Sequence, residues 1–129
     1  MISAPVARRV LRVVGSPERT VAISIGSPTL DLDPDFPGVW GCAVSIEGMG
    51  SDRALGEDSL QALLLAVELV RKKLDESGLA LSWLDDEPGH LGIPRTMMAY
   101  AFNAQLAREV EQFLDARIAA LNPSGEPSE

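Results

Sequence analysis

Residues 57–78 read EDSLQALLLAVELVRKKLDESG, and this stretch decides the fold because it specifies where a helix starts, which face it buries and where it ends. Asp58 suits the N-cap, and the side chain of Gln61 can accept a hydrogen bond from the backbone N–H of Asp58. Gly78 suits the left-handed residue that ends a helix. The apolar residues recur every three or four positions and predict one buried face: Leu60, Leu63, Leu64, Val67, Val70 and Leu74.

The residues before this helix predict a small sheet. Strands are expected at residues 6–14, 20–25 and 40–46, with a short fourth strand at 52–55 and a last strand at 79–84 after the helix. Residues 26–38 contain three prolines and two glycines and are predicted not to continue the sheet. Strands followed by a helix indicate an α+β fold, with an antiparallel meander of three to five strands and a helix packed on one face.

A second apolar repeat predicts a long C-terminal helix over residues 96–121, which Asn122 and Pro123 end. We therefore expect an α+β core domain at residues 1–95, the additional helix at 96–121 and a disordered tail at 122–129.

This second helix would be roughly 35 Å long, and the small sheet already has one helix to cover it. The second helix therefore packs either beside the first or on a second copy of the chain, and we favour the symmetric dimer. The first helix also carries apolar residues off its main stripe that need cover. The interface candidates are Leu65, Leu69, Met98, Phe102, Leu106, Val110 and Phe113.

Charge and composition exclude several classes of function. The net charge is −8, which disfavours binding to the phosphate backbone of nucleic acids. No apolar run approaches the roughly 20 residues that a membrane helix needs. A single cysteine, Cys42, rules out an intrachain disulfide and favours a reducing compartment, so we expect a cytoplasmic protein. Cys42 is more readily explained as a small buried hydrophobe than as a reactive thiol.

The loop at residues 85–95 holds the strongest cluster of chemically active side chains. Asp85, Asp86 and the chain's single histidine, His90, are candidate metal ligands or acid–base groups. A lone histidine lacks the paired spacing of a zinc site, so exposed loop charge is the favoured interpretation. The sequence assigns no catalytic residue and no cofactor.

Several segments resemble an uncharacterised family of small bacterial domains of unknown function. These segments are ARRVLRV (7–13), ISIGSP (23–28), IEG (46–48), GEDSLQALLLAVELVRKKL (56–74) and GIP (92–94). In that family a helix opens with Gly-x-Asp-Ser/Ala-Leu-Gln-Ala-Leu. The resemblance covers residues 6–95 and implies the fold without implying an activity, a cofactor or a catalytic residue.

Three hypotheses of function follow. The first is a non-catalytic protein-interaction domain, for example an inhibitor or immunity factor for a basic partner protein, because residues 31–129 hold seven basic and eighteen acidic side chains. The second is a small-molecule or metal-binding protein, or an enzyme, with its site on the 85–95 loop. The third is a self-assembling module organised by the C-terminal helix.

Overall fold

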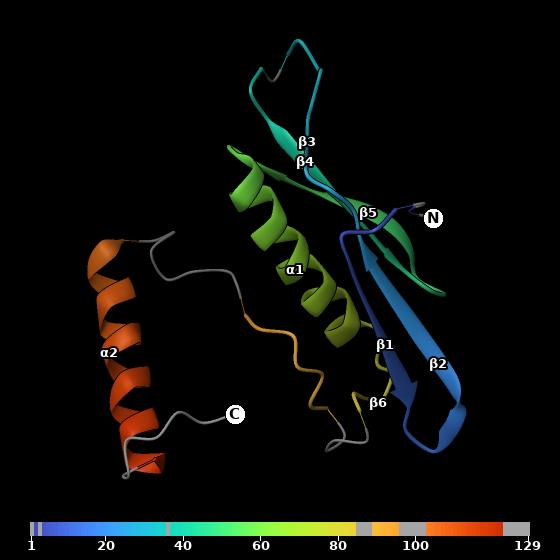
Figure 1. The fold of residues 1–129 in the computed structure, drawn as a ribbon, viewed down its shortest axis with the longest axis vertical. Helices are drawn as coiled ribbons and strands as arrows, with labels where there is room; N and C mark the ends of the chain where they lie inside the picture. Colours follow the sequence, from blue (N-terminus) through green and yellow to red (C-terminus); the bar gives the residue numbers. More distant parts are fainter. Residues whose placement is uncertain (1, 3, 36, 85–88, 96–102, 123–129) are drawn as a thin grey trace. The chain divides into compact units, whose positions relative to one another are not determined.

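The computed structural model describes residues 2, 4–35, 37–84, 89–95 and 103–122. These belong to two compact units, residues 1–96 and 97–129, which are described separately. The first unit contains an antiparallel sheet and one helix, and the second contains the C-terminal helix (Figure 1). The predicted α+β class is therefore correct. No helix in the described ranges combines the length and apolar character needed to cross a membrane.

The sheet of the first unit is antiparallel throughout. Its strands are β1 (Ala7–Val13), β2 (Ser16–Ile25), β3 (Thr29–Leu30), β4 (Trp40–Ile46), β5 (Gly50–Gly56) and β6 (Leu81–Ser82). β4 pairs along its whole length with β5, while its other edge pairs with β3 and then with β2. β2 pairs with β1, and β1 pairs with β6 over only two residues. The longer strands thus follow chain order across the sheet, as a meander does.

Three strand predictions need correction. Residues 26–38 do contribute a strand, because β3 pairs with the start of β4 before the prolines of this segment interrupt it. β2 begins at residue 16 rather than 20, after an irregularity in its pairing with β1 between Arg12 and Val13. The last strand shortens from the predicted 79–84 to two residues, and Leu84 adopts a left-handed φ of 54° that turns the chain away.

The helix α1 (Ser59–Glu76) starts almost as predicted. Asp58 is the N-cap, and its Oδ1 accepts a hydrogen bond from the Gln61 backbone N–H at 2.7 Å. Gln61 reaches back one residue further than expected, because its Oε1 accepts from the N–H of Glu57 at 2.6 Å. Ser77 is the C-cap, and Gly78 has the predicted left-handed φ, +73°. The start and end of this helix are therefore local properties of its sequence.

The face that α1 buries agrees with the predicted apolar stripe at Val70 and Leu74 and differs from it elsewhere. Its buried residues are Ala62, Ala66, Val70 and Leu74, whereas Leu60 is 62% exposed and Leu63, Leu64 and Val67 are half-buried. The reason is that the start of α1 lies very close to the end of β5. A Cβ on Gly56 would lie only 2.5 Å from the backbone nitrogen of Ala62. Alanines let the helix backbone come this near to β5, and the larger leucines are displaced to the flanks.

The sheet has one face turned to α1. Alternation along β1 places Leu11, which is fully buried, on this face together with Ala7 and Arg9. Arg8 and Val10 belong to the opposite face. The buried core cluster consists of Leu11, Val21, Ile23, Cys42, Val44, Ile46, Ala54, Ala62, Ala66, Val70, Leu74 and Leu81.

The second unit contains α2 (Ala104–Leu121), which begins eight residues later than the predicted helix. Asn103 is its N-cap, and the Oδ1 of Asn103 accepts from the Leu106 N–H at 2.7 Å. None of the residues of α2 is buried. Met98 and Phe102, two of the predicted interface residues, lie outside the described residues.

We predict that Gly56→Ala destabilises the protein by about 1–3 kcal/mol, because the added Cβ collides with backbone atoms that cannot rotate away. The matched control is Gly26→Ala, since a Cβ there meets its nearest neighbours at an ordinary 3.6 Å. Urea denaturation of both variants measures the difference. Equal stabilities would show that the helix is not held this close to β5.

Candidate functional site

Residues 89–95, which we call the strap, run beside α1 after the chain leaves β6 (Figure 1). The backbone N–H of Gly89 donates to the carbonyl of Leu81 at 2.9 Å. Arg9 on β1 donates from the same nitrogen, Nη1, to the carbonyl oxygens of Leu91 at 3.0 Å and Gly92 at 2.8 Å. One arginine thus fastens the strap to the sheet across more than eighty residues of sequence.

Trp83 and Gly92 also contribute to the contact between Arg9 and the strap. The guanidinium carbon of Arg9 lies 3.7 Å from the centre of the Trp83 ring, a cation–π contact. Gly92 has a left-handed φ of +65°, and a Cβ there would overlap the same ring. Glycine is therefore needed at position 92 for its backbone conformation and for its lack of a side chain.

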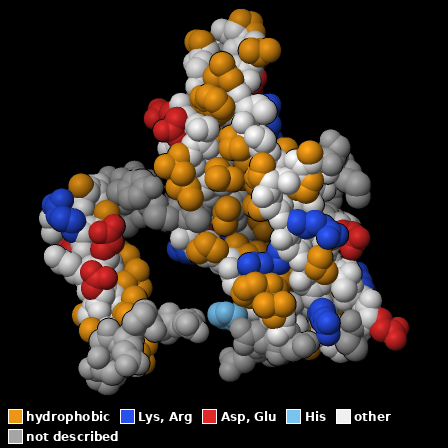
Figure 2. All heavy atoms as spheres, viewed as in Figure 1, with side chains coloured by type: hydrophobic (Ala, Val, Ile, Leu, Met, Phe, Trp, Pro, Cys, Tyr) orange, Lys and Arg blue, Asp and Glu red, His pale blue; other side chains and the backbone are white. Residues whose placement is uncertain are grey.

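A groove of about 240 Å³ lies between the sheet, α1 and the strap. Figure 2 shows hydrophobic side chains gathered on this side of the first unit, with basic side chains toward β1 and β2. The residues that line the groove are Ala7, Arg8, Arg9, Ile23, Ile25, Val67, Val70, Gly92, Ile93 and Pro94. Its surface is mainly apolar, and the half-buried side chain of Arg9 is the cation on the groove side of β1.

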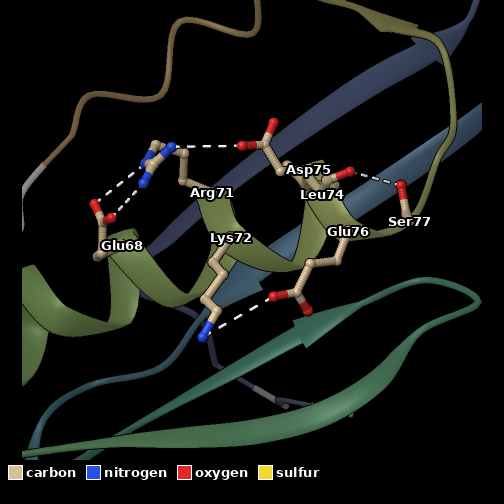
Figure 3. Close-up of polar contacts among 7 residues, drawn as sticks. All are labelled: Glu68, Arg71, Lys72, Leu74, Asp75, Glu76 and Ser77. Atoms are coloured by element: carbon tan, nitrogen blue, oxygen red, sulfur yellow. Dashed lines mark hydrogen bonds and ion pairs between the residues drawn. The ribbon is translucent and has the colours of Figure 1, made fainter.

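A second, more polar hollow lies on the other side of the strap, lined by Arg71, Asp75 and residues 89–93, His90 among them. Arg71 donates two hydrogen bonds to Glu68 and lies 3.6 Å from Asp75 (Figure 3). Donation of these hydrogen bonds to the Glu68 carboxylate raises the pKa of Arg71 above its ordinary value. The Nζ of Lys72 lies 3.9 Å from a carboxylate oxygen of Glu76. These charges are already matched within α1.

The predicted metal candidates are only partly placed. Asp85 and Asp86 lie outside the described residues, and His90 is exposed on the strap. Within the described ranges no three histidine, cysteine or acidic side chains converge as a metal site would require. Metal binding by Asp85, Asp86 and His90 stays a prediction.

Cys42 is fully buried, as predicted. Its Sγ donates to the carbonyl oxygen of Gly26 at 3.3 Å, and burial raises the pKa of the thiol. A protonated, inaccessible thiol is a poor nucleophile. Cys42 therefore packs the core.

Comparison with protein-family models matches residues 7–95 to a domain of unknown function, DUF6968. The chain belongs to this family. The match starts at the first residue of β1 and ends at the last residue of the strap, so the groove is built wholly from the family domain. Comparisons with curated proteins and with solved structures give no match.

Arg9, Trp83 and Gly92 are the site residues that sequence reasoning missed. Arg9 and Gly92 lie in the segments ARRVLRV and GIP, which carry the family resemblance and give no indication of a site. Alternation along β1 was a usable signal, because it places Arg9 on the same face as the apolar Leu11. Its partners lie more than seventy residues away and have no local signature.

We predict that Arg9→Met, which keeps much of the side-chain bulk but removes the donors, speeds amide hydrogen exchange at residues 89–95 and leaves β2 and β4 protected. The matched control is Arg8→Met, one residue away on the opposite face of the sheet, which should leave the strap unchanged. Exchange measured by mass spectrometry separates the two. Equal protection in both variants would mean that Arg9 does not hold the strap.

We also predict that Cys42 resists thiol reagents in the native protein and reacts only at the rate of unfolding. Because its pKa is raised on folding, its contribution to stability is present below the unfolded pKa and is lost as the pH rises through the folded pKa. Cys42→Ala should therefore show a smaller fall in stability between neutral and alkaline pH than the natural chain. Rapid native labelling would contradict this burial.

Proposed function

We propose that this protein is a non-catalytic interaction domain that self-associates through α2. The observation that carries the proposal is the apolar face of α2. Its large hydrophobic residues are all exposed, from 37% at Leu106 to 76% at Leu121; the others are Val110, Phe113, Leu114 and Ile118. The burial of Cys42, the chain's only thiol, also supports a role without nucleophilic cysteine chemistry.

An apolar face on an 18-residue helix needs a partner. A helix of this length is marginal in water without tertiary packing, and exposed apolar patches mark interaction surfaces. The opposite face of α2 is polar and locally satisfied, since Gln105 bonds to both Arg108 and Glu109. This two-sided character supports α2 as an interface helix.

A second copy of α2 is the partner that this face fits best. In an antiparallel pair, Phe113 and Leu114 meet at the symmetry axis and Leu106 meets Leu121 of the other copy. Arg117 lies within the apolar face and makes no ion pair among the described residues. The same pairing sets Arg117 opposite Val110, where its long side chain can reach Glu109 or Glu111 of the other copy. Self-pairing therefore covers the apolar residues and supplies a carboxylate for the arginine.

Two of the predicted interface residues, Leu65 and Leu69, belong to α1 of the first unit. Both are half-buried and already pack against the core cluster. Leu60 is the most exposed leucine of α1. A basic partner protein stays a second prediction, supported by the net charge of −8.

We predict that Phe113→Glu converts a dimer into a monomer, because the charge falls at the centre of the paired faces. The matched control is Gln112→Glu, which adds the same charge one residue away on the polar face and should leave the dimer intact. Light scattering after size exclusion, repeated over a dilution series, measures both. A monomeric natural chain, or equal effects of the two substitutions, would overturn self-association.

A small-molecule binder with its site at residues 85–95 is the second candidate, and the groove beneath the strap favours it. The two functions use different parts of the chain and are compatible.

A further inference from the structure

We propose that the groove between β1, β2, α1 and the strap binds a small aliphatic carboxylate, and that Arg9 is the residue that receives its anionic group. This proposal does not depend on self-association, because every residue that lines the groove belongs to the first unit.

The walls of the groove suit an unbranched apolar chain. β2 contributes Ile23 and Ile25, α1 contributes Val67 and Val70, and the strap closes the groove with Ile93 and Pro94. A volume of about 240 Å³ exceeds the roughly 150 Å³ apolar cavity that holds a benzene molecule in an engineered protein. The groove is thus large enough for a short aliphatic chain and too small for a drug-sized ligand.

Arg9 supplies the charge that selects an anion. Its side chain is half-buried, and none of its contacts is to a carboxylate: it bonds to two backbone carbonyls and stacks on Trp83. No ion pair joins it to any residue in the part of the chain that the structure describes. A partly buried cation in a protein of net charge −8 is expected to have an acidic partner.

The geometry of the Arg9 guanidinium leaves room for such a partner. A guanidinium carries five N–H donors, and both hydrogen bonds that Arg9 donates to described residues start from Nη1. The N–H groups on the other two nitrogens donate to no described residue, and they can donate to the two oxygens of a carboxylate. The lining residues offer one guanidinium on the groove side of β1, which matches a single negative charge. Arg8 also borders the groove, but strand alternation directs its side chain to the opposite face of the sheet.

The test uses octanoate as the ligand and octanol as its neutral counterpart. Octanoate should raise the melting temperature of the full-length protein saturably, and amide NMR shifts should map to β1, β2, the middle of α1 and the strap. Octanol should bind about tenfold more weakly or worse, because it lacks the charge-assisted hydrogen bonds to Arg9.

Two variants and a control locate the site. Arg9→Met loosens the strap and should weaken both ligands, but octanoate should lose about tenfold more affinity than octanol, because only octanoate loses the charge-assisted hydrogen bonds. Ala7→Leu fills the groove while keeping Arg9 and the strap, and should weaken both ligands. Arg19→Met, which removes an exposed arginine of β2 that does not line the groove, should change neither.

The proposal is overturned if octanoate and octanol bind equally well, or if Arg9→Met binds octanoate as well as the natural chain. The absence of any saturable octanoate effect would also overturn it. The monomeric variant Phe113→Glu should still bind octanoate, so failure of the ligand site and failure of self-association are told apart by separate measurements.

Discussion

The close contact between Gly56 and the start of α1 is the constraint on which the rest of the first unit depends. With no side chain at Gly56, the backbone of Ala62 can approach β5, and Ala66, one turn later, is also buried. This approach selects which face of α1 is buried. It also positions Val67 and Val70, which form one wall of the groove.

The strap depends on a different kind of contact. Backbone carbonyls in a loop need hydrogen-bond donors, and Arg9 provides one nitrogen to two of them while its cationic group rests on Trp83. These contacts leave the positive charge of Arg9 unmatched by any described carboxylate. Arg9 therefore both holds the strap in place and gives the groove its positive charge.

α2 differs from the family domain in its physical role. The family match ends at residue 95, before this helix, and α2 buries none of its own residues. Its stability must come from contacts beyond its own turns. An interface function for α2 and a ligand function for the family domain thus draw on independent features of the same chain.

The sequence by itself determined the N-cap and the C-terminal glycine of α1, the order of the longer strands, the α+β class and the burial of Cys42, because these depend on neighbouring residues and on apolar periodicity. It also located the family domain almost to the residue. Only the tertiary structure decided that Ala62 and Ala66, and not Leu60, Leu63 and Leu64, are buried, since that depends on how closely a glycine on another strand lets the helix approach. It alone joined Arg9, Trp83 and Gly92, because a cation–π contact and a steric requirement for glycine have no signature across seventy to eighty residues of intervening sequence.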